Sequence, residues 1–150
     1  MTTSFPQLGL DAQLCFPLYA ASRAVTRRYS ALLAQAGLTY PQYLCLLALW
    51  EADDPMTVGE LGARLRLDSG TLTPVLKRLE AAGHLGRRRD PADERRVLLE
   101  VTPTGWERRD RVADVPLGIA SGMGLSEAEA AQLRSLLDRM LVGLDDSVPD

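Results

Sequence analysis

The feature that most constrains this chain is a pair of short helix patterns, followed at once by an arginine-rich hairpin pattern. The segment TVGE opens the first helix as a capping box, with Thr57 and Glu60 three positions apart, and predicts a helix over 58–66. The segment LDSGTLTPVLKRLEAAG predicts the second helix, with Asp68 or Ser69 as its N-cap. Two short helices joined by a tight turn have the outline of a helix-turn-helix.

The second of these helices has one apolar face and one polar, basic face. Leucine and valine side chains recur at helical spacing on the inward face, at Leu72, Val75, Leu76 and Leu79. The outward face carries the candidate DNA-contacting residues Ser69, Thr71, Thr73, Lys77 and Arg78. The basic side chains can neutralise phosphates, and the hydroxyls can meet phosphates or base edges. The pattern leaves open which residue does which.

The next stretch, HLGRRRDPADERRVLLEVT, predicts a hairpin that carries five arginines. Two strand patterns, 84–89 and 96–101, flank a turn rich in proline and aspartate. Residues 64–96 hold nine Lys and Arg against five Asp and Glu, whereas the whole chain has a net charge of −3. A basic segment inside an acidic chain is typical of a phosphate-binding surface, although a solvated charged face produces the same pattern.

A long helix pattern over 11–36 precedes this region. Asp11 is the expected N-cap, and Gly37 is the expected end. Proline is tolerated only in the first helical turn, so Pro17 moves the expected start of the regular helix to about Phe16, with Cys15 at its N-terminal end.

Three more helices complete the expected fold. Thr39 and Gln42 form a capping-box pattern before YLCLLALW, a helix that is apolar on every side and therefore buried. After the hairpin, TPTGWERRDRVADV and SEAEAAQLRSLLDRMLVGL predict two further helices. The expected fold class is mainly α, a winged helix-turn-helix with the order ααααββαα.

Length and composition limit the classes of function. The chain has 150 residues, which fits a single domain over 1–150. No signal-peptide pattern and no apolar run of membrane-spanning length occur, so we expect a cytoplasmic protein without a membrane partner. Two cysteines thirty residues apart and one histidine provide no metal-ligand spacing. We expect no metal, no cofactor and no enzymatic activity.

The chain resembles the MarR family of winged-helix transcription regulators over nearly its whole length. The most specific part is DERRVLLEVTPTG, residues 93–105, which is similar to the wing signature of that family. The resemblance implies that Asp93 orients Arg95 toward the DNA minor groove, with Arg87 and Arg96 adding to the DNA-binding surface. It also implies a homodimer on a pseudo-palindromic double-stranded operator. Its winged helix-turn-helix part covers about 40–102, and its dimerisation helices cover about 10–37 and 103–147.

Within that family the chain is most similar to the organic-hydroperoxide-sensing repressors of the OhrR type. The segments LDAQLCFPLY, LTYPQYLCLLALWE and LDSGTLTPVLKRLEAAG carry this likeness. It implies that Cys15 is the sensing cysteine, and that Tyr29 and Tyr40 donate hydrogen bonds to its sulfur from the dimer partner. An organic hydroperoxide would oxidise Cys15, the operator would be released, and a low-molecular-weight thiol would cap the sulfur.

Two alternatives remain open at the level of sequence. The first is a MarR-type regulator that responds to a small aromatic or phenolic ligand, with Cys15 inert. The second is a thiol peroxidase, which lacks support because no resolving cysteine or catalytic histidine is visible. The chain departs from the OhrR pattern in two ways: it has a proline at position 17, and it has no cysteine in 103–150.

Overall fold

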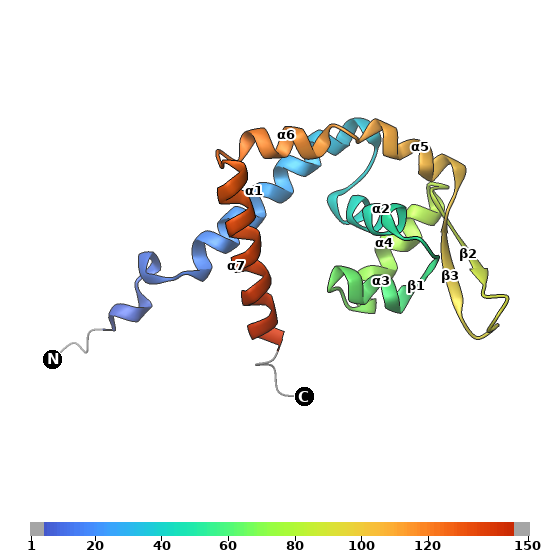
Figure 1. The fold of residues 1–150 in the computed structure, drawn as a ribbon, viewed down its shortest axis with the longest axis horizontal. Helices are drawn as coiled ribbons and strands as arrows, with labels where there is room; N and C mark the ends of the chain where they lie inside the picture. The colour runs from blue at the N-terminus through green and yellow to red at the C-terminus, as the bar shows by residue number, and fades with distance from the viewer. Residues whose placement is uncertain (1–4, 146–150) are drawn as a thin grey trace. The chain divides into compact units, whose positions relative to one another are not determined.

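A computed structural model describes residues 5–145 of the chain, and its backbone falls into two compact units. The first unit runs to Val115 and the second begins at Pro116. Figure 1 shows the ribbon with its element labels. The first unit contains the 3-10 helices η1 (Pro6–Leu8), η2 (Leu10–Ala12) and η3 (Ala34–Ala36), the helices α1 (Cys15–Leu33), α2 (Tyr40–Glu51), α3 (Val58–Leu65), α4 (Ser69–Ala81) and α5 (Pro103–Arg111), and the strands β1 (Met56–Thr57), β2 (Leu85–Arg89) and β3 (Val97–Val101).

Helix α1 begins at Cys15, and the expected cap Asp11 is wrong. Asp11 lies in η2, and Leu14 precedes α1 without any side-chain cap. Pro17 explains this start, because a helix that began earlier would place proline beyond the first turn, where its missing N–H breaks the ladder. Gly37 ends the segment at a φ of 67°, as predicted.

Both capping boxes predicted from the sequence are confirmed. The Thr39 N–H donates to Gln42 Oε1 at 2.9 Å, and the Gln42 N–H donates to Thr39 Oγ1 at 3.4 Å. The Thr57 N–H donates to Glu60 at 2.7 Å, and the Glu60 N–H donates to Thr57 Oγ1 at 3.2 Å. These bonds satisfy backbone donors that a helix start leaves without partners, so α2 and α3 begin where the pattern placed them.

The core of the first unit forms between the helices α2, α3 and α4 and one face of the sheet. Helix α2 is buried on nearly all sides, as its apolar sequence predicted, with Leu47 as an exposed exception. The predicted inward face of α4 is confirmed. The fully buried large side chains include Tyr43, Leu46, Leu61, Leu72, Leu76, Leu79 and Leu99. Helix α4 and the hairpin therefore pack against the same core, which holds them in a fixed arrangement.

The sheet has three antiparallel strands in the order β1-β3-β2. The predicted hairpin is confirmed, with Leu85 opposite Val101 and Arg89 opposite Val97. Strand β1 was not predicted. It is two residues long, too short for an alternating pattern, and it exists because β3 offers its second edge to Met56 and Thr57.

The region after the hairpin contains three helices, whereas the sequence patterns predicted two. Helix α5 ends at Arg111, and the additional helix α6 (Val115–Gly122) and helix α7 (Glu127–Asp145) follow. Pro116 lies in the first turn of α6, where proline is tolerated, and it cannot continue α5. The segment VPLGIASGMG was not predicted to be helical because its glycines have a low helix propensity.

The second unit leaves many of its apolar side chains exposed, although Ile119 of α6 is buried. No described residue of α7 is buried, and Leu117 of α6 together with Leu133, Leu136 and Val142 of α7 are exposed. No single helix of the described chain is long and apolar enough to cross a membrane. The consecutive segments Cys15–Ala36 and Tyr40–Glu51 pass such a test only together, by length and composition, and they are bent by 74°.

Candidate DNA-binding surface and cysteine site

Helix α4 begins with a strong cap that also holds one of its candidate hydroxyls. Asp68 accepts from the Thr71 N–H at 2.8 Å and from the Thr71 hydroxyl at 2.9 Å. The hydrogen bond from the Thr71 N–H, and after it the one from the Thr71 hydroxyl, hold the pKa of Asp68 below its usual value. The Thr71 side chain is therefore engaged at the helix start, and its oxygen keeps lone pairs for an incoming donor.

The outer face of α4 leaves all five candidate residues accessible. Ser69, Thr71, Lys77 and Arg78 are exposed, and Thr73 is half-buried. Pro74 lies inside α4 and removes one hydrogen bond of the helix ladder, to the carbonyl of Gly70. The arrangement is a helix with hydroxyls in its first turns and cations on its later turns, facing away from the core.

The predicted pair in the wing is present in the structure. Asp93 accepts from Arg95 Nε at 3.0 Å and from Arg95 Nη2 at 3.1 Å, a bidentate arrangement. These bonds from Arg95 hold the pKa of Asp93 below its usual value. The Arg95 side chain is still 90% exposed, so the pair fixes the direction of a cation that projects into solvent.

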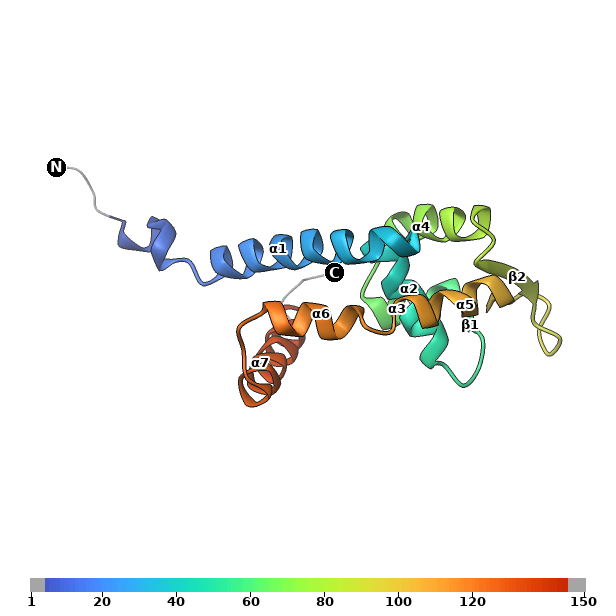
Figure 2. The ribbon, with the colours of Figure 1, turned by 90° about the horizontal axis from the view of Figure 1, so that it is seen from above.

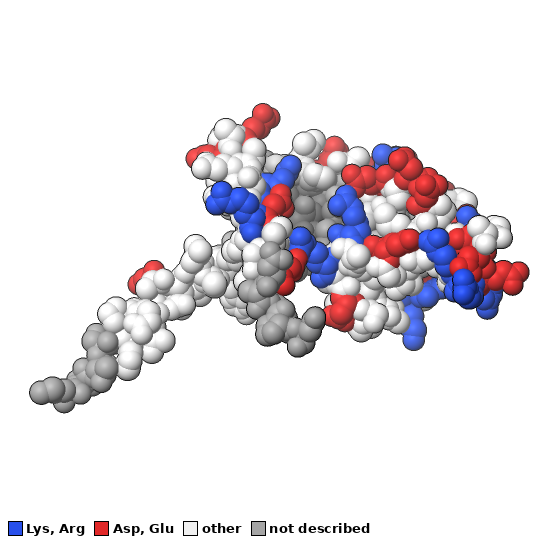
Figure 3. Space-filling view, turned by 60° about the horizontal axis from the view of Figure 1, so that its bottom comes forward, with Lys and Arg blue, Asp and Glu red and all other residues white. Residues whose placement is uncertain are grey.

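The other candidate arginines of the hairpin have carboxylate partners within the chain. Arg87 binds Glu80 of α4, with Nε 2.5 Å from Oε1, and Arg96 binds Glu60 of α3 at 2.8 Å. Arg88, a further hairpin arginine, lies 3.5 Å from a carboxylate oxygen of Glu100. In Figure 3 basic and acidic side chains are interleaved at the right-hand end, where Figure 1 places the hairpin. Much of the positive charge that the sequence concentrates here is neutralised locally.

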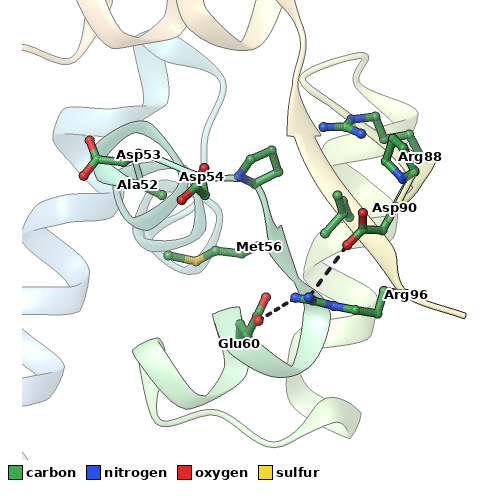
Figure 4. A pocket seen from close by; sticks show the side chains of 11 residues that line it. Ala52, Asp53, Asp54, Met56, Glu60, Arg88, Asp90 and Arg96 are labelled. Carbon is green, nitrogen blue, oxygen red and sulfur yellow. Dashed lines mark hydrogen bonds and ion pairs between the residues drawn. The ribbon is translucent and has the colours of Figure 1, made fainter. Parts of the chain in front are cut away.

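An open hollow of about 770 Å³ lies between the loop after α2 and the turn end of the hairpin (Figure 4). Asp53 and Asp54 line one side, and Arg88, Asp90 and Arg96 line the other. Opposite charges already face one another across this space. Among residues 5–145, no group of three or more histidine, cysteine or acidic side chains is arranged to hold a metal ion.

Cys15 lies at the first residue of α1 and is exposed. Figure 2 shows the N-terminal half of α1 extending away from helices α2 to α4. Tyr29 is fourteen residues farther along the same helix, which at 1.5 Å per residue is about 21 Å away. A single chain therefore does not bring the two predicted parts of the sensing site together.

The two predicted tyrosines are in contact with each other. The rings of Tyr29 and Tyr40 stack with centroids 4.0 Å apart and an interplanar angle of 9°, and the ring of Tyr43 lies 5.7 Å from that of Tyr29. Burial raises the pKa of both Tyr29 and Tyr40, and so both keep their hydroxyl protons. The stack is a preformed aromatic surface with hydroxyl donors.

Cys45 is a core residue, as predicted. It is fully buried in α2, and burial raises the pKa of its thiol to about 11. At neutral pH almost no thiolate forms, so this sulfur attacks poorly.

Two further side chains, Thr102 and Arg108, hold α5 against earlier parts of the chain, and neither was singled out from the sequence. The Thr102 hydroxyl caps α5 by accepting from the Gly105 N–H at 3.0 Å, and it donates to the Gly83 carbonyl at 2.6 Å. Arg108 Nη1 donates to the carbonyl of Ala36 at 3.1 Å and so links α5 to the end of the α1 segment. The cap of α5 is formed within four residues, from Thr102 to Gly105, whereas nothing in the sequence pairs positions 36 and 108.

Comparison with known proteins agrees with this geometry. A family model described as "Transcriptional regulator SarA/Rot" matches residues 27–112. The chain is 45% identical over 136 residues to the organic hydroperoxide resistance transcriptional regulator of Bacillus subtilis (strain 168). The matched residues cover 91% of this chain and 90% of that protein. The chain belongs to the MarR-like winged-helix family of transcriptional regulators.

Other members of the MarR-like family extend the comparison. The chain is 50% identical over 134 residues to the HTH-type transcriptional regulator TtmR of Methylorubrum extorquens (strain PA1), covering 88% of this chain and 66% of that protein. A structure of reduced AbfR bound to DNA matches with a TM-score of 0.77 and 36% identity, over 93% of this chain and 95% of the other. The resemblance and the winged helix-turn-helix class inferred from the sequence are both confirmed.

Proposed function

We propose that this MarR-like protein is a homodimeric, DNA-binding repressor that releases its operator when an organic hydroperoxide oxidises Cys15. The observation that carries the proposal is an exposed thiol at the start of α1, in a chain 45% identical to a regulator named for organic hydroperoxide resistance. We place the protein in the cytoplasm with its DNA. Neither a cofactor nor a catalytic cycle is part of the proposal.

DNA recognition would use α4 and the wing of each subunit. Two α4 helices in a symmetric dimer would enter successive major grooves of a pseudo-palindromic operator. Arg95, fixed in direction by Asp93 and 90% exposed, would enter the flanking minor groove, where the narrow groove strengthens the negative potential. The remaining candidate contacts are Ser69, Thr71, Thr73, Lys77, Arg78 and Arg87, which lie on α4 or on the first strand of the wing.

The sensing step is a two-electron oxidation at Cys15. The thiolate attacks one peroxide oxygen, the O–O bond breaks, and the alkoxide leaves and takes a proton as the alcohol. Cys15 is then a sulfenic acid, which a low-molecular-weight thiol converts to a mixed disulfide with loss of water. Tyr29 and Tyr40 of the partner subunit would donate hydrogen bonds to the thiolate, because α1 separates them from Cys15 within one chain. Oxidation removes that arrangement and biases the dimer toward a form that does not fit the operator.

The test is DNA binding with and without an oxidant. The DNA upstream of the protein's own gene is titrated with the reduced protein, then with protein treated with an organic hydroperoxide. We expect the reduced protein to bind and the treated protein to release, while Cys15→Ser binds and stays bound. Absence of binding by the reduced protein would contradict the DNA-binding role. Release of the Cys15→Ser protein would assign sensing to another group.

A further inference from the structure

Arg96 connects the turn end of the wing to the helix-turn-helix. It directly precedes β3, and its Nη2 lies 2.8 Å from Glu60 Oε1 of α3, thirty-six residues earlier in the chain. Its Nη1 lies 3.7 Å from Asp90 Oδ2 on the opposite side of the hairpin turn. Figure 4 shows the guanidinium between these two carboxylates. The backbones of Arg96 and Asp90 are also paired, with the Asp90 N–H donating to the Arg96 carbonyl at 3.0 Å.

Glu60 is itself held rigidly, so it is a firm anchor for Arg96. Its Oε2 accepts from the Thr57 N–H at 2.7 Å and from the Thr57 hydroxyl at 3.0 Å. The hydrogen bond from the Thr57 N–H, and after it the one from the Thr57 hydroxyl, hold the pKa of Glu60 below its usual value. The positive charge of Arg96 lowers this pKa as well. Thr57 belongs to β1 and pairs with Leu98 of β3. The cap of α3, the edge strand and the wing therefore meet at one carboxylate.

The surroundings of Arg96 do not suit a DNA phosphate. Glu60 and Asp90 together carry one more charge than the guanidinium, and Asp53 and Asp54 line the same hollow. A phosphate brought here would meet a surplus of negative charge. The neighbouring Arg95 differs, because its side chain is 90% exposed whereas that of Arg96 is 46% exposed.

We infer that Arg96 is a positioning residue that sets the angle of the wing on α3 through Glu60, and that it is not a DNA contact. Each strand of the wing has five residues, so Arg96, at the turn end, holds the hairpin about 16 Å from its base at Leu85 and Val101. A tilt of about 10° at the base would move the tip by about 3 Å at that length, as far as the length of a hydrogen bond. Arg95 can reach the minor groove in register with α4 only when this tilt is fixed. The inference rests on the proposed DNA-binding role.

Salt dependence separates a positioning residue from a phosphate contact. The affinity for the operator is measured over a range of salt concentrations for the wild type, Arg96→Gln, Glu60→Gln, the double variant and Arg95→Gln. Glutamine at position 60 preserves the capping box, since that motif accepts either Glu or Gln, so Glu60→Gln removes mainly the ion pair. Arg95→Gln is the matched control, a neutralised arginine one residue away.

The expected result has three parts. Arg96→Gln and Glu60→Gln each weaken binding by about 3- to 10-fold with an unchanged salt slope, a size typical of residues that act at a distance. The double variant is no weaker than either single variant, because both remove the same link. Arg95→Gln lowers the slope by about one unit, as expected when one cation leaves the interface. A lowered slope for Arg96→Gln, or tighter binding by Glu60→Gln, would overturn the inference.

A readout without DNA keeps the inference separate from the proposed function. Amide hydrogen exchange is compared for the same variants at residues 56–57 and 97–99, outside the turn that Asp93 and Arg95 themselves hold. We expect faster exchange in Arg96→Gln and Glu60→Gln and wild-type exchange in Arg95→Gln. If the wild type binds no operator but this pattern appears, the proposed function fails and the positioning link stands. If the wild type binds and exchange is unchanged in all variants, the positioning link fails.

Discussion

Asp93 holds Arg95 with both carboxylate oxygens, at 3.0 and 3.1 Å, while the arginine remains the most exposed of the ion-paired side chains of the wing. The two residues are only two positions apart in the sequence. The Arg95 N–H also donates to Asp93 Oδ1, at 3.1 Å. Asp93 therefore orients both the backbone and the guanidinium of the residue that we assign to the minor groove.

Removal of either partner should weaken DNA binding. We expect Arg95→Ala to cost about 1–3 kcal/mol of binding free energy, and Asp93→Ala to weaken binding several-fold although it removes a negative charge. Titration of the operator by fluorescence anisotropy measures both. Tighter binding by Asp93→Ala would mean that this carboxylate only repels DNA and does not orient Arg95.

The tyrosine hydroxyls should control the rate of sensing without controlling the fold. Phenylalanine preserves the 4.0 Å ring stack, so Tyr29→Phe and Tyr40→Phe should unfold at nearly the wild-type denaturant concentration. Each should slow the oxidation of Cys15 by an organic hydroperoxide, measured with a sulfenic-acid probe. Tyr19→Phe is the control, since the hydroxyl of exposed Tyr19 accepts from Arg23 on its own helix. Equal slowing in all three variants would remove the specific role of the stacked pair.

Oxidation should end in a mixed disulfide on Cys15 and not in a protein disulfide. Cys45 is fully buried and the pKa of its thiol is raised to about 11, so it provides little thiolate to attack a sulfenic acid. Intact-mass analysis after treatment with a peroxide and a small thiol should show one adduct per subunit, located on Cys15. A covalent dimer on a non-reducing gel, or a loss of about two hydrogens per subunit, is the contrary outcome.

Gly105→Ala should be strongly destabilising. A Cβ atom at this position would lie 2.2 Å from the carbonyl oxygen of His84, and so the backbone of α5 or of the turn before β2 must move. We expect the free energy of unfolding to fall by about 2–3 kcal/mol, a cost typical of overpacking. Gly59→Ala is the matched control, since the nearest atom is the Thr57 hydroxyl at 4.0 Å and alanine favours the helix. Urea unfolding followed by circular dichroism compares the two.

The stability of the protein should fall as the pH drops from about 7 to about 5. Burial, and secondly the charge of Arg108, lower the pKa of His84 below the value of about 6.5 found in unfolded chains. The unfolded state then binds more protons in this range, so the contribution of His84 is present above the unfolded pKa and is lost below it. His84 is the single histidine of the chain, so His84→Gln should flatten this part of the pH profile. The same slope in both proteins would contradict the assignment.

Local signals in the sequence determined where α2, α3 and α4 begin and which face of α4 points inward. The capping boxes at Thr39 and Thr57 are complete within four residues, so no distant partner is needed to predict them. The pair of Asp93 and Arg95 belongs to the same class, because two residues of separation keep the side chains near each other and the turn between the strands brings them into contact. Helix α6 and strand β1 escaped prediction for the opposite reason. The glycines and the proline of α6 oppose helix locally, and β1 exists only as a partner for β3.

Only the tertiary structure decided which of the wing arginines meet carboxylates that are distant in the sequence. The sequence places Asp93 beside Arg95, but it does not show which of the other hairpin arginines meet a carboxylate. The fold brings Glu80 to Arg87 and Glu60 to Arg96, across separations of seven and thirty-six residues, and leaves Arg95 projecting into solvent. Charge is a property of composition, whereas its neutralisation depends on which carboxylates the packed elements place within about 4 Å. That distance is set by the packing of α3, α4 and the sheet on their common core, and no local pattern encodes it.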